Sequence, residues 1–173
     1  MPYYPLNLLY LGVLSLVNMT DDVQELNGEK YDAMYTEAIR FKSFQNWPFD
    51  ENSACSASKM AEAGFFHCPT KHEPDLVQCY VCFKELDGWE ATDEPWAEHF
   101  SHSKICLFAQ LRKPQKDLTV AEIYKIESER KKNKIKRVIA QHLQKFRKMT
   151  DELEGFIQEQ IKVIEVSKKK KKT

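Results

Sequence analysis

Residues 79–106 read CYVCFKELDGWEATDEPWAEHFSHSKIC, and this stretch decides the fold of the chain. Two residues separate Cys79 from Cys82, sixteen follow before His99, and six more precede Cys106. Three thiolates and one imidazole form a standard ligand set for a tetrahedral zinc ion. Because four protein ligands leave no position for a water or a substrate, we expect one structural zinc ion and no catalytic metal.

Two points about this ligand set stay open at the level of sequence. We expect His99 and Cys106 to lie about two helical turns apart, but His102 is on a neighbouring turn and could replace His99. The cysteines could instead be a chance cluster, or a disulfide pair in a secreted protein. Cys55 and Cys68 stand outside the set, and we expect them to pack as buried thiols.

Several motifs follow the order and spacing of the baculovirus inhibitor-of-apoptosis repeat. They are Arg40-Phe41-x-Ser43-Phe44-x-Asn46-Trp47-Pro48, Met60-Ala61-x-Ala63-Gly64-Phe65-Phe66-His67, Asp75-x2-Gln78-Cys79-x2-Cys82, Gly88-Trp89 and Glu98-His99-x6-Cys106. The chain resembles this family over about residues 40–111 and is most similar to its short single-repeat members. The resemblance implies an α+β fold: a small zinc-stabilised repeat with a three-stranded antiparallel sheet and short helices, followed by one long C-terminal α-helix.

Local patterns place the elements of the repeat. Mixed three- and four-residue apolar spacing predicts a short helix in residues 31–44. Residues 58–64 read as a second helix, in which Gly64 can supply a left-handed C-terminal cap. Residues 65–67, 76–81 and 85–89 read as strands, and Glu94-Pro95 opens the helix that carries His99. A core drawn from roughly seventy residues is marginal without a metal, so chelation should unfold the repeat.

A peptide-binding surface is expected beside the zinc site, on the strand that ends at Trp89 and the helix start after it. An aromatic wall and several carboxylates there suit a free N-terminal ammonium followed by a small side chain. The residues concerned are Leu86, Asp87, Trp89, Asp93, Glu98 and His102. The resemblance implies a groove for peptides that begin with alanine and add as an edge strand. The alternative is that Asp93 and Glu98 only complement the positive end of a helix.

The resemblance also implies contacts with a histone tail. Lys84 and His102 match positions that face a phosphothreonine near the start of the tail, and both can donate charge-assisted hydrogen bonds to phosphate. Glu73 and Asp87 match acidic positions that face a basic residue of the tail. Asp87 is one carbon shorter than the glutamate usual there, which weakens that part of the match.

The repeat is expected to span residues 31–113, followed by a linker at 114–118, a long helix at 119–166 and a lysine tail at 167–173. Thr119 and Glu122 form a capping box that opens the helix. Between Lys125 and Lys148 the helix is rich in lysine and arginine. This segment is either a solvated face or a contact for DNA or an acidic partner.

The later part of the helix carries an apolar seam with coiled-coil spacing. Additional apolar positions widen the seam, which suits two partner helices better than one. We predict a partner-helix interface at Ile135, Val138, Ile139, His142, Leu143, Phe146, Met149, Leu153, Phe156, Ile157 and Ile161. The resemblance implies a bundle with helices of borealin and the inner centromere protein, which places Aurora B kinase. A self-associating coiled coil is the alternative, and a homodimer through the linker is a further possibility.

Residues 1–30 are expected to lie outside the folded repeat. Residues 6–17 are almost entirely apolar, but the run is too short to span a bilayer and is closer to a signal-peptide core. No lysine or arginine precedes it, and a Cys3His zinc site suits a reducing compartment. We expect a non-native or optional extension with Met19 as a candidate start and disordered polar residues after it; a real targeting segment is the alternative.

The chain offers no pairing of a nucleophile with a base, so we expect no enzyme. The resemblance implies a non-enzymatic adaptor of the chromosomal passenger complex that reads a phosphorylated histone tail and helps localise Aurora B in mitosis and cytokinesis. It would act in the nucleus, at centromeres and the spindle midzone, and in the cytoplasm, without a membrane. The alternative is an inhibitor of apoptosis that acts on caspases or their antagonists through the same groove.

Overall fold

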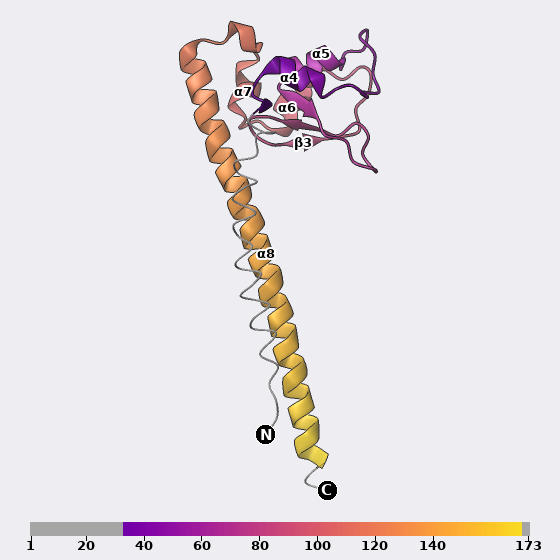
Figure 1. Cartoon of the computed structure of the whole chain (residues 1–173), viewed down its shortest axis with the longest axis vertical. Coiled ribbons are helices and arrows are strands. Elements are labelled where there is room, and N and C mark those ends of the chain that lie inside the picture. Colours follow the sequence, from indigo (N-terminus) through magenta and orange to yellow (C-terminus); the bar gives the residue numbers. More distant parts are fainter. Residues whose placement is uncertain (1–32, 171–173) are drawn as a thin grey trace. The chain divides into compact units, whose positions relative to one another are not determined.

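The computed structural model describes residues 33–170 (Figure 1). The elements are α4 (Glu37–Lys42), α5 (Ala57–Glu62), β1 (Phe65–His67), β2 (Val77–Cys79), β3 (Glu85–Leu86), α6 (Pro95–His102), α7 (Leu107–Leu111), the 3-10 helix η1 (Gln115–Asp117) and α8 (Val120–Lys170). The expected α+β architecture of a three-stranded sheet, short helices and one long C-terminal helix is confirmed. Our predictions for residues 1–30 and for the end of the lysine tail lie outside the described residues.

The three strands form one antiparallel sheet in the order β1-β2-β3. β2 is shorter than predicted because the chain turns at Cys79, where the amide of Phe83 donates to the Cys79 carbonyl at 3.0 Å. β3 also ends early, because Gly88 takes a left-handed φ of +74° before Trp89. β3 is therefore a short edge strand that pairs with β2 on one side only.

Gly64 follows the C-cap residue of α5 with a φ of +92°, as its predicted role requires. The position has a second constraint that the sequence did not indicate. A Cβ atom at Gly64 would lie 2.8 Å from the ring of Phe108, which is fully buried. Glycine is needed there both for the backbone conformation and for the close approach of α7.

The core of the repeat contains a charged side chain, Arg40, which is fully buried. Its Nε donates to the carbonyl of Ala61 at 3.0 Å, and its Nη1 donates to the carbonyl of Tyr35 at 2.8 Å. The guanidinium lies 4.3 Å from the ring centroid of Tyr80, close enough for a cation-π contact. Burial lowers the pKa of Arg40. Arg40 thus links the entry to α4, the end of α5 and the aromatic core.

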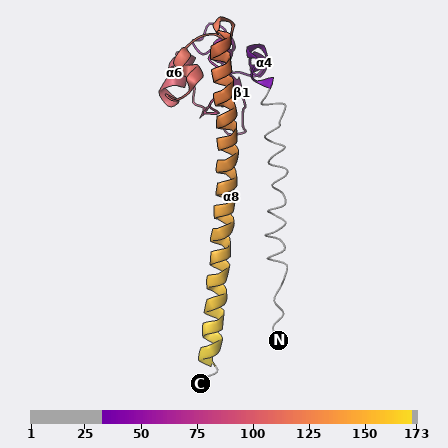
Figure 2. The ribbon, with the colours of Figure 1, turned by 90° about the vertical axis from the view of Figure 1, so that its left-hand side faces the viewer.

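The first turns of α8 pack against the repeat. Thr119 and Glu122 form the predicted capping box, with the Thr119 amide donating to Glu122 Oε2 at 2.8 Å. Further along, Ile126 is 1% exposed within the core cluster, and Asn133 Nδ2 donates to the Val81 carbonyl at 3.2 Å. The compact unit that contains the repeat ends at Ile135. From there α8 continues as a single helix, and Figure 2 shows it without interruption.

None of the helices within residues 33–170 is long and apolar enough to cross a membrane.

Candidate zinc centre and peptide groove

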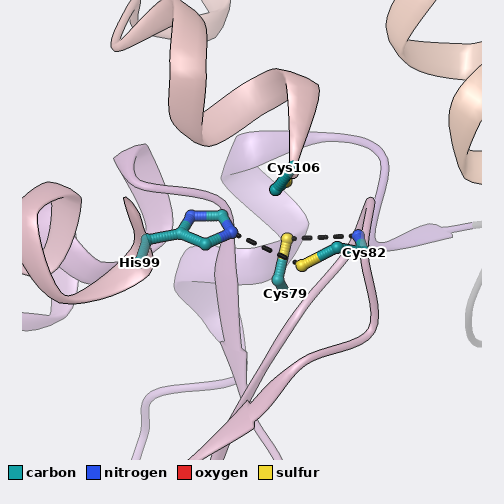
Figure 3. Close-up of side chains that lie close together, drawn as sticks. All are labelled: Cys79, Cys82, His99 and Cys106. Carbon is teal, nitrogen blue, oxygen red and sulfur yellow. Dashed lines mark hydrogen bonds between the residues drawn. The ribbon is translucent and has the colours of Figure 1, made fainter. Parts of the chain in front are cut away.

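Four ligand atoms converge where the sheet meets α6 and α7 (Figure 3). Cys79 ends β2, Cys82 lies in the turn after it, His99 is on α6, and Cys106 is the N-cap residue of α7. Their ligand atoms all lie within 4.8 Å of one another. Zinc–sulfur bonds of about 2.3 Å in a tetrahedral site bring ligand atoms to similar separations. The donor set therefore fits one structural zinc ion.

The turn between the first two ligands wraps its backbone around a sulfur atom. The amide of Val81 lies 3.3 Å from Cys79 Sγ, and the amide of Cys82 lies 3.5 Å from it. Both N–H groups point partial positive charge at a sulfur that is a thiolate in the zinc-bound form. Phe83 completes the turn with a φ of +59°, a left-handed conformation that is uncommon for a side chain of this size.

The structure selects His99 over His102 as the fourth ligand. His99 Nδ1 lies 2.9 Å from the carbonyl of Ala63, so Nδ1 carries the proton and donates it. Nε2 is then the nitrogen with a free lone pair, and it lies 3.6 Å from Cys82 Sγ. The alternative residue, His102, is exposed, and its Nε2 lies 3.5 Å from Glu98 Oε2.

One expectation about this part of the site was wrong. His99 and Cys106 do not lie two turns apart on a single helix, because α6 ends at His102 and Ser103 leaves the helical conformation with a φ of −145°. Cys106 begins the separate helix α7. The break lets the chain bend back so that Cys106 approaches the sheet, which a continuous helix would prevent.

The metal-binding side chains hold their protons unequally. The hydrogen bond from Cys106, and to a smaller extent the one from Cys79, lowers the pKa of Cys82. Burial raises the pKa of Cys79, and the hydrogen bond with Cys79 raises that of Cys106. Burial opposes protonation of His99, but the sulfurs of Cys106 and Cys82 outweigh it and raise the pKa of His99 to about 9. The metal-free cluster thus retains protons, and these must leave when zinc binds.

The disulfide alternative does not fit the described chain. Cys79, Cys82 and Cys106 form no disulfide, and neither does Cys55. Cys55 is fully buried, as predicted, and its thiol donates to the carbonyl of Glu90 at 3.2 Å, whereas Cys68 is only half-buried, so the same prediction was wrong for it. Burial raises the pKa of this thiol. Cys55 is therefore a packed side chain with no role in metal binding.

A surface cavity of about 280 Å³ lies along the edge strand β3 and reaches α6. We call it the peptide groove. Its lining residues are Lys84, Glu85, Leu86, Asp87, Gly88, Trp89, Asp93, Glu98 and His102. The groove brings together every predicted peptide-binding residue except Glu73. Glu85 and Gly88 were not predicted, although both lie between predicted positions on the same short stretch.

Glu73 lies elsewhere, in the loop before β2. Its Oε2 accepts a hydrogen bond of 3.2 Å from Thr70 Oγ1, and the Thr70 hydroxyl in turn accepts from the Glu73 amide at 3.0 Å. These contacts stabilise a local turn. Glu73 was predicted to line the groove, and nothing in the sequence indicated that its loop lies outside it.

Two residues of the groove wall, Trp89 and Asp93, are held in place by contacts with other parts of the repeat. The Trp89 amide donates to Asp75 Oδ2 at 2.7 Å, and the indole packs edge-on against Phe65 with 5.6 Å between ring centroids. Asp93 Oδ2 accepts from the Glu90 amide at 2.8 Å, which fixes that carboxylate at the rim. Carboxylates outnumber cations among the lining residues, so the groove favours a cationic group.

The residues of the predicted partner-helix interface leave a row of large apolar side chains at the surface of α8. Ile135 and Phe146 are 54% and 55% exposed, and Phe156 is 39% exposed. The other exposed members are Ile139, Leu143, Leu153, Ile157 and Ile161.

Comparison with known proteins agrees with the motifs in the repeat. Residues 40–110 match the Inhibitor of Apoptosis domain (BIR). The chain is similar to Baculoviral IAP repeat-containing protein 5.2-B of Xenopus laevis, with 42% identity over 125 residues that cover 72% of this chain and 80% of that protein. It is also similar to Baculoviral IAP repeat-containing protein 5 of Mus musculus, with 52% identity over 102 residues that cover 59% and 73% of the two chains.

Proposed function

Because this chain belongs to the baculoviral inhibitor-of-apoptosis repeat family, in its single-repeat survivin group, we propose that it is a non-enzymatic adaptor of the chromosomal passenger complex. Its repeat reads the phosphorylated N-terminal tail of a histone, and its helix α8 joins helices of borealin and the inner centromere protein. Together these contacts help to localise Aurora B kinase at centromeres and the spindle midzone. A zinc site saturated by four protein ligands supports a structural rather than a catalytic repeat.

The observation that carries the proposal is the position of the groove. It follows β3, whose outer edge pairs with no described strand, so a peptide can add there as a further antiparallel strand. Trp89 supplies an apolar wall for a small first side chain. Asp93 and Glu98 supply carboxylates for a terminal ammonium.

The two cationic residues of the groove support recognition of a phosphate. Lys84 and His102 lie among the lining residues, together with the carboxylates. A phosphate on the third residue of the peptide can accept charge-assisted hydrogen bonds from both side chains. A hydrogen bond to a charged group contributes about 1.5 to 3 kcal/mol, so even one of the two should make the phosphorylated peptide bind roughly ten- to a hundredfold more tightly.

The proposal is tested by titrating the full zinc-loaded chain with two histone-tail peptides that start with alanine. The peptides are identical except for a phosphate on the third residue. We expect a preference of about tenfold or more for the phosphorylated peptide, and Lys84→Ala should abolish the preference. Lys71→Ala is the matched control, because Lys71 is an exposed lysine outside the groove. Equal binding of both peptides would refute phosphate reading, and no binding of either would refute the groove.

The exposed apolar row on α8 supports the second half of the proposal. A continuous row of half-exposed isoleucine, leucine and phenylalanine side chains is unfavourable in water and favours burial against other helices. Co-purification with the borealin and inner centromere protein helices should be lost in Ile139→Asp and Phe146→Asp. The same variants should leave peptide binding unchanged, because neither residue lines the groove.

Inhibition of apoptosis through the same groove is the second candidate. The observation that favours it is the match of residues 40–110 to the Inhibitor of Apoptosis domain. Caspases or their antagonists would then present the N-terminal peptide. This function predicts binding of unphosphorylated alanine-starting peptides at least as tight as that of phosphorylated ones, together with direct inhibition of a caspase.

A further inference from the structure

The charges of α8 are separated along its length. Residues 131–150 contain six lysines, two arginines and no acidic residue. Residues 151–165 contain five acidic residues and one lysine. Neither the zinc site nor the peptide groove uses the basic segment, and the apolar row accounts for only one face of it.

Three exposed cations of this segment lie beside or opposite the apolar row. Successive residues of an α-helix are rotated by about 100°, so Lys136 and Arg147 lie about a quarter of a turn from the line through Ile135 and Phe146, at the edge of the row. Lys148 lies nearly on the opposite side of the helix. All three basic side chains are exposed. Lys148 approaches Glu152 at 4.0 Å, but both side chains are mostly exposed, and such a pair contributes little to binding energy. Partner helices on the apolar row would therefore leave Lys148 accessible, with Lys136 and Arg147 at the edge of the contact.

The arrangement suits a long, regular polyanion. Twenty residues of helix extend about 30 Å, and double-stranded DNA carries about one charge per 1.7 Å of its axis. A duplex carries phosphates at regular intervals along its whole length, so the basic segment can bind it at any position. An acidic protein would have to place its carboxylates opposite particular lysines. Single-stranded nucleic acid is less suitable, because the aromatic residue of the segment, Phe146, belongs to the apolar row and offers no stacking surface among the cations.

We propose that residues 131–148 of α8 form a sequence-independent binding surface for the phosphate backbone of double-stranded DNA. The surface is independent of the peptide groove and does not rest on the function proposed above. It would add an electrostatic contact with chromatin to any contact made through the repeat. Its affinity depends on the release of counterions from DNA, so it falls steeply as the salt concentration rises.

The test measures binding of the full zinc-loaded chain to a labelled 20-base-pair duplex by fluorescence anisotropy at several salt concentrations. The variant Lys136→Gln/Arg147→Gln/Lys148→Gln should bind about ten- to a hundredfold more weakly, and the slope of log affinity against log salt should fall by about 2 to 3. The control Lys71→Gln/Lys104→Gln/Lys116→Gln changes the net charge equally at exposed lysines outside the segment and should bind like the wild type. The lysines at 168–172 are present in every variant, so they do not contribute to the difference.

A charge-retaining variant, Lys136→Arg/Arg147→Lys/Lys148→Arg, separates loss of charge from damage to the helix and should bind DNA like the wild type. Three results would overturn the proposal: equal binding by the glutamine variant, an equal loss in the control, or competition by poly-glutamate as strong as that by duplex DNA at the same charge concentration. Failure of the phosphopeptide titration would leave these results unchanged, and the glutamine variant should still bind the peptide.

Discussion

The side-chain amide of Asn133 on α8 donates a hydrogen bond of 3.2 Å to the carbonyl oxygen of Val81, which lies between the first two zinc ligands. Two turns earlier on the same helix, Ile126 is buried in the core cluster. The start of α8 thus stabilises the turn that presents Cys79 and Cys82. The start of the helix is therefore part of the folded repeat.

Removal of these contacts should lower the stability of the repeat. We expect Ile126→Ala to lower the free energy of unfolding by about 2 to 5 kcal/mol, since it leaves a cavity in the core. Asn133→Ala should lower it by about 1 kcal/mol. Ile139→Ala is the matched control, because Ile139 is 52% exposed and its loss should change little. Denaturant titration followed by tryptophan fluorescence measures all three; an equal effect of Ile139→Ala would contradict the docking of α8.

Removal of zinc should unfold the repeat. The four ligands come from three segments of the chain, which are the turn at residues 79–82, α6 and the start of α7. A zinc ion joins all three. We expect a chelator to abolish near-ultraviolet circular dichroism and added zinc to restore it. Cys79→Ser should behave like the chelated wild type, whereas Cys55→Ser should retain its zinc because Cys55 lies outside the cluster. A folded, metal-free repeat would contradict the structural role of zinc.

Gly64→Ala should be strongly destabilising. The new methyl group would meet the Phe108 ring at 2.8 Å, and the φ of +92° is unfavourable for alanine. Together these effects should lower the free energy of unfolding by about 2 to 4 kcal/mol. Gly155→Ala is the matched control: it lies within α8 with no atom near the added methyl group, and it should stabilise the helix by about 0.5 to 1 kcal/mol. Thermal unfolding of the two variants compares them directly.

The start of α8 should respond to acid. The pKa of Glu122 is lowered from 4.5 to about 2. The main cause is the ammonium of Lys113, which lies 2.6 Å from Glu122 Oε1, and the amide and hydroxyl of Thr119 contribute less. Since the pKa is lower in the folded chain, this contribution to stability is present above pH 4.5 and is lost as the pH falls toward 2. We expect amide exchange in the first turn of α8 to accelerate over this range. Glu122→Gln removes the titrating group, so its exchange should vary less; a Glu122 carboxyl titrating near 4.5 would refute the prediction.

Local sequence patterns were sufficient for the parts of this protein whose partners are close in the chain. Cys79 and Cys82 form one turn, Thr119 and Glu122 form one capping box, and Gly64 ends one helix; each was predicted from spacing and residue type. The groove residues on β3, after it and on α6 were also predictable, because they are neighbours on one short stretch and match a family motif.

Other features depend on contacts between residues far apart in the chain, and these only the tertiary structure decided. His99 is the zinc ligand, and not His102, because the carbonyl of Ala63 accepts its Nδ1 proton across a separation of 36 residues. Arg40 is buried because carbonyls of α5 and of the chain before α4 surround it. Asn133 reaches Val81 across 52 residues. Spacing specifies which side chains can bind a metal or cap a helix, but packing specifies which of them face one another.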